Sequence, residues 1–169
     1  MQKSVLGLLL GAAIIATPSA HAATSASLAQ VLDLVNAARA EKGCGPLVIN
    51  EHLNAAAERE SRAMVTKAFF NHTEPDGTTP GMRVHATGYA FQMIGENIEA
   101  DSDTEAATAF TNWMNSPGHR DNILTCAFKE TGLALVEQTD DRQVDGVPEG
   151  DRYFWTQVFA MPVRTQDGR

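Results

Sequence analysis

The chain has 169 residues, of which 43% are hydrophobic and 20% are charged, a composition typical of one globular domain with its own core. Its 13 Lys and Arg against 21 Asp and Glu give a formal net charge of −8, which disfavours binding to the phosphates of nucleic acids. No apolar stretch is long enough for a transmembrane helix, so no transmembrane anchor is predicted.

The first 22 residues have the pattern of a secretory signal peptide. Lys3 supplies a positive charge, an apolar run extends from Val5 to Ala16, and the small residues Ala20 and Ala22 flank His21 at a cleavage site. We therefore expect residues 23–169 to form a single domain that is secreted or periplasmic. In such an oxidising compartment Cys44 and Cys126 favour a disulfide, and two reduced buried thiols are the alternative.

The first half of the predicted domain is helical. Apolar residues at helical spacing predict a helix over Leu28–Ala38, followed by a short apolar link at Leu47–Ile49. Asn50 is typical of a helix N-cap, and the helix that it opens is predicted to reach Phe69. Glu60 lies on the apolar stripe of that helix, so its carboxylate lies either at the edge of the packed face or in a cleft.

The second half mixes short helices and strands. Thr79 and Pro80 predict the start of a short helix that reaches Ala86, and the alternation over Ile94–Glu99 predicts a strand. A further helix, capped by Ser102 or Asp103, is predicted to pass Met114 and to break at Ser116–Gly118, before one more turn of helix over His119–Leu124. Two β-rich segments, Lys129–Thr139 and Arg152–Val163, flank an acidic, turn-rich tip and predict a hairpin. The fold class is therefore α+β, with helices that cover a small, mostly antiparallel sheet.

Three residues beside predicted turns could form a functional cluster. His72 follows the second helix, Glu96 shares a strand face with Ile94 and Ile98, and His119 follows the turn after Trp113. Two imidazoles and a carboxylate can bind zinc or act as general acid and base. Each residue can equally be a hydrogen-bonded group without a function, and the sequence contains neither a G-x-S-x-G nor an H-E-x-x-H motif.

Several short motifs, taken together and in order, resemble the CAP superfamily (cysteine-rich secretory proteins, antigen 5 and pathogenesis-related 1), also called the SCP domain. The motifs span about residues 28–161, and their form resembles the bacterial branch. They are Asn36–Arg39, Gly45–Leu47, Phe70–His72, Pro75–Gly77, Arg83, Gly88–Tyr89, Gly95–Ile98, Trp113–Arg120, Asn122–Leu124 and Trp155–Phe159.

The resemblance implies a three-layer α-β-α sandwich and a cleft with two His and two acidic residues, which in some members binds zinc or another divalent ion. His72 and Glu96 match the family pattern, whereas Ser116 stands at the position of the second acid and Phe154 at that of the second His. His119 and Asp76 are the candidates that replace them.

We therefore expect a non-enzymatic binding module that requires no cofactor. Its cleft would take a small apolar or lipidic ligand, a divalent metal ion or a cell-envelope partner. The first alternative is a metal-assisted protease or esterase in which His72, Glu96 and His119 hold the ion, and the second is a structural envelope or matrix protein.

Overall fold

The computed structural model describes residues 20–163, with side chains described from Thr24 onward. The predicted signal peptide lies outside the described residues, apart from Ala20 to Ala22 at the beginning of the first helix. Over the part of the chain that is described, no helix has both the length and the apolar character needed to cross a membrane.

Five helices and four strands make up the described chain. In chain order they are α1 (Ala20–Glu41), β1 (Val48–Ile49), α2 (Glu51–Lys67), α3 (Pro80–Ala86), β2 (Phe91–Asp101), α4 (Ala106–Asn115), α5 (Pro117–Leu124), β3 (Glu130–Glu137) and β4 (Tyr153–Pro162).

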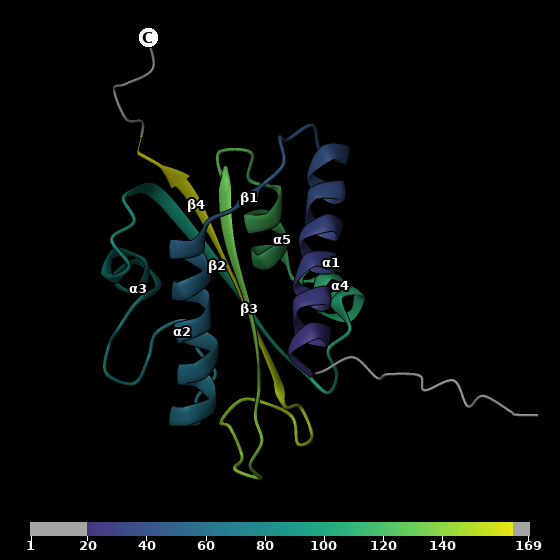
Figure 1. Ribbon diagram of the computed structural model, residues 1–169, viewed down its shortest axis with the longest axis vertical. Coiled ribbons are helices and arrows are strands. Elements are labelled where there is room, and N and C mark those ends of the chain that lie inside the picture. The colour runs from purple at the N-terminus through teal and green to yellow at the C-terminus, as the bar shows by residue number, and fades with distance from the viewer. Residues whose placement is uncertain (1–19, 164–169) are drawn as a thin grey trace, which may run out of the picture.

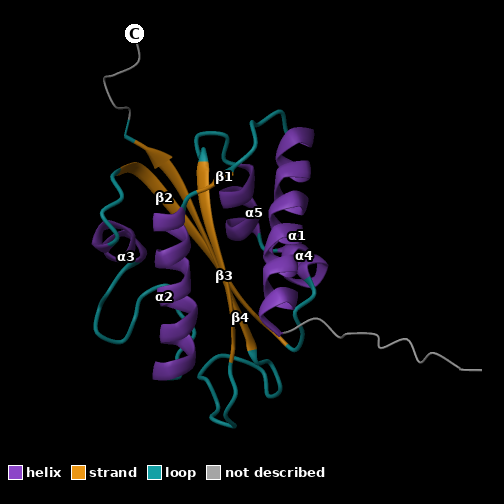
Figure 2. Cartoon of the chain, viewed as in Figure 1, coloured by secondary structure: helices purple, strands orange, loops and turns teal. Residues whose placement is uncertain are grey.

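The strands form one sheet in the order β1-β3-β4-β2, in which only the β1–β3 pair is parallel. Helices α2 and α3 cover one face of this sheet, and α1, α4 and α5 cover the other (Figure 1). Figure 2 shows the resulting sandwich of helix, strand and helix layers, and it confirms the predicted α+β class and the α-β-α architecture.

Apolar side chains fill both spaces between the layers. On the α1 side, Val31 and Val35 pack with Trp113 and Trp155, all of them without solvent exposure. On the α2 side the helix lies directly against β3, because Gly132 has no side chain and a Cβ there would overlap the backbone of α2. This close contact sets the distance between α2 and the sheet.

The structure confirms most of the predicted elements. Helix α2 begins directly after Asn50, whose side-chain oxygen accepts a hydrogen bond from the His52 N–H, and β3 and β4 form the predicted hairpin. The apolar link at Leu47–Ile49 was an incomplete prediction, because Val48 and Ile49 form β1. Two residues carry no local strand pattern, and this strand exists only through its pairing with β3.

Two predicted helix starts were wrong. Helix α4 begins at Ala106 with Glu105 in the N-cap position, and neither Ser102 nor Asp103 caps it. The Asp103 carboxylate instead accepts a hydrogen bond from the Glu105 N–H and closes a turn before the helix. Helix α5 already begins at Pro117, since proline suits the first position of a helix, where its missing N–H needs no partner.

Cys44 and Cys126 form the predicted disulfide, which ties the end of α1 to the loop after α5. Beside it the fully buried Arg39 donates hydrogen bonds to the carbonyl oxygens of Ile123, Thr125 and Phe128. These three backbone carbonyl groups therefore all accept hydrogen bonds from one guanidinium group.

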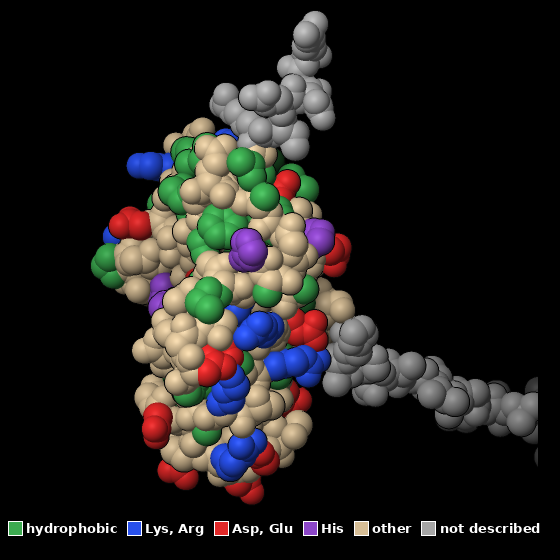
Figure 3. Space-filling view, turned by 90° about the vertical axis from the view of Figure 1, so that its left-hand side faces the viewer, with side chains coloured by type: hydrophobic (Ala, Val, Ile, Leu, Met, Phe, Trp, Pro, Cys, Tyr) green, Lys and Arg blue, Asp and Glu red, His purple; other side chains and the backbone are tan. Residues whose placement is uncertain are grey.

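Positive and negative side chains lie close together on the face made by α2 and α3 (Figure 3). Between α2 and α3, Lys67 at the end of α2 forms ion pairs with Glu74 and Asp76 of the loop that connects the two helices. On this face the acid excess of the chain does not gather into one negative patch.

Candidate functional site

Strand β2 connects the two helical layers through consecutive residues of the Gly95-Glu96-Asn97 motif. Neighbouring side chains of a strand point to opposite faces, so Glu96 faces α3 and Asn97 faces α5. The Asn97 amide donates to the His119 carbonyl oxygen (3.1 Å), and Asn122 of α5 donates back to Asn97 Oδ1 (2.9 Å). Gly95 leaves room for these side chains, because a Cβ there would lie 2.8 Å from Asn122 Oδ1 and 3.0 Å from the Phe128 ring, so that Asn122 would have to shift.

On the α3 side Glu96 is held by a buried arginine. Nη2 of Arg83 lies 2.9 Å from both carboxylate oxygens of Glu96, and it also donates to the His72 carbonyl oxygen (3.0 Å). Glu96 Oε1 in turn lies 3.0 Å from His72 Nδ1. Arg83 thus fixes both the loop that carries His72 and the carboxylate that orients its ring.

The same arginine lies among two further buried carboxylates. Nη1 of Arg83 is 2.9 Å from Glu60 Oε2 and 3.8 Å from Glu74 Oε1. Glu74 is also paired with Arg59 and Lys67, which reach it from the surface. The sequence left two places for Glu60, the edge of the packed face or a cleft, and the structure places it in the interior with no solvent exposure.

The contacts of Glu60 point to different protonation states. The short distance to Arg83 suits an ionised carboxylate, but neither Glu60 oxygen has a hydrogen-bond partner among the described residues. Burial raises the pKa of Glu60 to about 8, against the opposing effect of Arg83. We favour the protonated form at neutral pH, because Arg83 already has an ionic partner in Glu96 and no hydrogen bond among the described residues compensates a second buried negative charge.

His119 lies across the edge of β2 from His72, with ring centroids 6.4 Å apart and the rings nearly perpendicular. Burial lowers the pKa of His119, and the nearby His72 lowers it further. His119 Nδ1 is buried without a hydrogen-bond partner, whereas 45% of the His72 side chain is exposed. The structure therefore brings the predicted His72, Glu96 and His119 together, and we refer to these three residues as the cleft cluster.

The other predicted site residues lie outside the contacts of this cluster. Asp76 pairs with Lys67 in the exposed loop after α2, and hydrogen bonds from Thr78 and Lys67 hold the pKa of its carboxyl well below the usual range. Ser116 occupies the N-cap position of α5 without a side-chain capping bond. Phe154, at the position of the second family His, is fully buried and packs edge-on against Phe70, so this position belongs to the core.

Sequence reasoning missed the central role of Arg83. The residue is buried on α3 together with Val84, and nothing in the seven residues of this short helix distinguishes it from an exposed arginine. Its carboxylate partners are on α2, β2 and the loop between α2 and α3, so only the assembled fold identifies them.

The residues of the cleft cluster do not fit a three-ligand metal site. Glu96 directs its carboxylate at Arg83 and His72, which leaves the two imidazoles as the remaining donors. Among the described residues no group of three or more His, Cys, Asp or Glu is arranged to hold a metal ion. We therefore derive no reaction step that passes through zinc.

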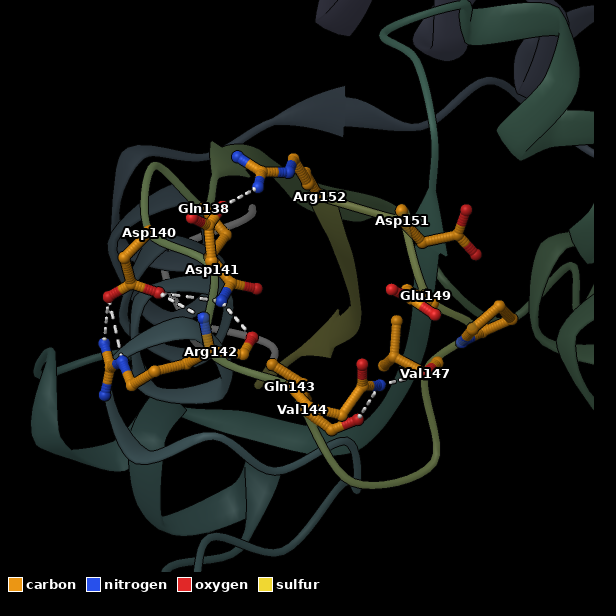
Figure 4. A pocket seen from close by; sticks show the side chains of 12 residues that line it. Gln138, Asp140, Asp141, Arg142, Gln143, Val144, Val147, Glu149, Asp151 and Arg152 are labelled. Carbon is orange, nitrogen blue, oxygen red and sulfur yellow. Dashed lines mark hydrogen bonds and ion pairs between the residues drawn. The ribbon is translucent and has the colours of Figure 1, made fainter.

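Two cavities of the described chain lie away from the cleft cluster. One of about 310 Å³ is enclosed by the hairpin tip, residues 138–152, where Arg142 pairs with Asp140 and Arg152 with Asp141 (Figure 4). Another, of about 290 Å³, has mostly apolar walls and lies between α1 and α2, at the β1–β3 edge of the sheet. This apolar groove includes Leu28, Leu32, Ile49 and Leu133, and it is distant from β2 in the sheet order.

The family model of the cysteine-rich secretory protein family, CAP, matches residues 32–159 of this chain. YkwD of Bacillus subtilis strain 168 is 36% identical over 143 residues, which cover 85% of this chain and 50% of YkwD. The membrane protein YlbC of the same organism is 27% identical over 130 residues, which cover 77% of this chain and 33% of YlbC. The chain thus spans half the length of one relative and a third of the other.

Solved structures show the same architecture. An extracellular SCP-domain protein from Bacillus anthracis str. Ames superposes with a TM-score of 0.68 at 26% identity, covering 86% of this chain and 44% of the other. An outer surface protein from Borrelia burgdorferi gives a TM-score of 0.70 over 82% of this chain and 95% of its own, and at 19% identity this similarity concerns the fold alone.

Proposed function

This chain belongs to the CAP family of cysteine-rich secretory proteins, and from that membership we propose that it is an exported, non-enzymatic binding domain. It would be active in the periplasm or outside the cell, where the cleft cluster would recognise a hydrogen-bond-donating group of a cell-envelope component. The N-terminal pattern of a signal peptide and the similarity to an extracellular SCP-domain protein support export.

The arrangement of Arg83, Glu96 and His72 carries this proposal. A carboxylate that is paired with a guanidinium accepts hydrogen bonds, so Nδ1 of His72 carries the proton that Glu96 accepts. In the neutral ring the other nitrogen, Nε2, is then an acceptor on a half-exposed side chain. Since Arg83 and Glu96 are both buried, the acceptor is oriented before any ligand arrives.

We consider an enzymatic function less favoured. An imidazole that acts as a general base in covalent catalysis needs a nucleophilic side chain within hydrogen-bond distance. Among the described residues neither imidazole of the cleft cluster is hydrogen-bonded to a Ser, Thr or Cys side chain. The two imidazoles lie close enough together to favour metal-assisted hydrolysis as the second candidate, but that function needs further ligands from outside the cluster.

An apolar or lipidic ligand is better suited to the apolar groove than to the cleft cluster. The groove offers about 290 Å³ between leucine and isoleucine side chains, whereas the cluster offers imidazole nitrogens beside a buried ion pair. We therefore assign the polar partner to the cluster and consider the apolar ligand separately.

The test is a binding assay of the exported protein with an isolated cell-envelope fraction. His72→Ala is expected to weaken retention about tenfold, the effect of losing a well-oriented hydrogen bond. His85→Ala removes an exposed histidine of α3 and serves as the matched control, with unchanged retention. Equal retention of the wild type and His72→Ala would refute the site.

Two further measurements separate the alternatives. Zinc titration of the wild type, His72→Ala and His119→Ala would reveal tight, stoichiometric metal that both substitutions abolish, if the protein is a metal-assisted hydrolase. Extraction of the purified protein with organic solvent, followed by mass spectrometry, would detect an apolar ligand. Loss of such a ligand in Leu32→Glu, but not in His72→Ala, would place it in the apolar groove.

A further inference from the structure

A cavity of about 310 Å³ lies at the carboxyl-terminal end of β2, beside the hairpin tip. Its walls include Phe70, Glu99, Asp101, Asn112 and Asp151, and residues 146–148 close one side. Glu99 and Asp101 lie on the strand face opposite to Glu96, toward α4, so this cavity is separate from the cleft cluster. We refer to it as the acidic cavity.

The acidic cavity contains negative charge without a positive partner. Glu99 Oε1 and Asp101 Oδ1 both accept from the same Asn112 amide nitrogen, at 3.2 and 3.1 Å. In the described part of the chain, no Lys, Arg or His forms an ion pair with Glu99, Asp101 or Asp151.

The arginines of the hairpin tip are engaged with other residues. Figure 4 shows Arg142 paired with Asp140 and Arg152 paired with Asp141, while Asp151 lies on the other side of the loop. The carboxylates of Glu99, Asp101 and Asp151 are therefore available to a positively charged ligand.

Asp101 provides a second, independent observation. It is only 7% exposed, it lines the acidic cavity, and its Oδ2 has no hydrogen-bond partner among the described residues. A buried carboxylate oxygen without a partner is costly, and a group that enters the cavity and donates a hydrogen bond to it would remove that cost. Rotation about the last torsion of Asp is soft, so this oxygen can turn toward a group that enters the cavity.

The protonation equilibria agree with this geometry. Burial raises the pKa of Glu99 to about 7, and the neighbouring Asp101 and Asp151 add to the effect. Burial also raises the pKa of Asp101 to about 6, with contributions from Asp103 and Asp151. Carboxylates with shifted equilibria at a cavity are candidates for ligand binding.

We propose that the acidic cavity binds a protonated primary amine. An ammonium group has three N–H donors, which match the carboxylates of Glu99, Asp101 and Asp151. The ring of Phe70 adds a surface that attracts cations, and Val147 and Pro148 can cover a methylene chain.

An amine suits this cavity better than a metal ion. The described carboxylates are not arranged to hold a metal, which requires oxygens at about 2.0–2.6 Å from one centre. Charge-assisted N–H···O bonds of about 2.8 Å reach carboxylates that are spaced more widely. A cavity of about 310 Å³ accommodates an aminoalkyl chain, either the side chain of a lysine or a free diamine.

The test titrates the full exported protein by calorimetry at pH 7.5 with three probes. Cadaverine represents a free amine, Nα-acetyl-lysine-N-methylamide represents a lysine side chain, and 1,5-pentanediol is the uncharged control. Binding of either amine without binding of the diol supports the proposal, and the tighter of the two identifies the source of the ammonium group. Absence of binding for both amines, or equal binding of the diol, overturns it.

Substitutions in the cavity walls test whether the amine binds in the acidic cavity. Asp101→Asn and Glu99→Gln are each expected to weaken amine binding at least about tenfold, the effect of losing a charged hydrogen-bond acceptor. Asp33→Asn removes the same charge from an exposed residue of α1 outside the cavity walls, and it should change the affinity less than about twofold because salt screens exposed charges. Melting temperatures measured in parallel establish that Asp101→Asn remains folded. Unchanged affinity in both cavity variants would refute the location.

The affinity should also depend on pH. The charged groups around the cavity are Glu99, Asp101 and Asp103 on β2 and the following turn, and Asp151 on the hairpin. As the pH rises from 5 to 8 the first two ionise while the amine stays protonated, so binding tightens. A constant affinity over this range would contradict the proposal, as would preferential binding of Ca²⁺. None of these outcomes depends on the cleft cluster, so the two proposals fail separately.

Discussion

Glu60 is a carboxylate without solvent exposure and without a hydrogen bond, 2.9 Å from Arg83. We predict that Glu60→Gln stabilises the protein at alkaline pH, because glutamine has nearly the same shape and cannot ionise. The opposite outcome follows if Glu60 is an ionised partner of Arg83, since breaking a buried ion pair typically costs about 3–5 kcal/mol. The sign of the effect therefore decides between the two states.

The magnitude follows from proton binding. Folded Glu60 keeps its proton up to about pH 8, whereas in the unfolded chain the group ionises near its ordinary value of 4.5. The folded state binds more protons in this window, so the contribution of Glu60 to stability is complete below pH 4.5 and is lost as the pH rises to about 8. At about 1.4 kcal/mol for each pKa unit, the loss is on the order of 5 kcal/mol.

The assay is urea unfolding of both proteins at pH 5, 6.5 and 8. The difference in unfolding free energy should be within about 1 kcal/mol at pH 5 and should reach a few kcal/mol in favour of Glu60→Gln at pH 8. Glu58→Gln on the exposed side of the same helix is the control, for which the difference should stay small at every pH. If Glu60→Gln is the less stable protein at pH 8, the assignment of a proton to Glu60 is wrong.

Replacing both Cys44 and Cys126 by Ser removes a cross-link between residues 82 positions apart, and it should lower the unfolding free energy by about 4–5 kcal/mol; a loss below about 1 kcal/mol in denaturant would contradict this expectation. Gly132→Ala places a Cβ against the backbone of α2 and should cost at least about 2 kcal/mol, so an unchanged melting temperature would mean that α2 moves freely. In an NMR titration the pKa of His119 should lie below 6.5, and His72→Ala should raise it only in part, since burial is the larger cause. A His119 that titrates at 6.5 or above in the wild type would argue against its burial.

The elements that the sequence predicted well are those with strong local signals. Asn50 and the apolar spacing of α2 define that helix within its own residues, and the hairpin of β3 and β4 is marked by its acidic tip. Strand β1 has no such signal, because two residues become a strand only beside β3, which lies about 80 positions away. The start of α4 was misplaced because Asp103 closes a turn in the way that it would cap a helix.

The candidate site was predicted only in part, because some of its residues have local sequence signals and others depend on the assembled fold. His72, Glu96 and His119 could be selected by residue type and by their neighbouring turns, and the structure brings them together. Arg83 and Glu60 could not be assigned, because their roles depend on how α3 docks against α2 and β2. A charged residue on an apolar helix face signals that a partner exists, but the partner is identified only in three dimensions.

The sheet order β1-β3-β4-β2 has a consequence for the time at which this protein can fold. The last strand in the chain, β4, lies between β3 and β2, so β2 has no sheet neighbour until Tyr153–Pro162 are present. A growing chain that lacks these residues can form helices but not the sheet on which they pack. The complete sheet therefore forms only after the whole of β4 has been synthesised, and until then the helices on both faces lack the surface against which they pack in the folded domain.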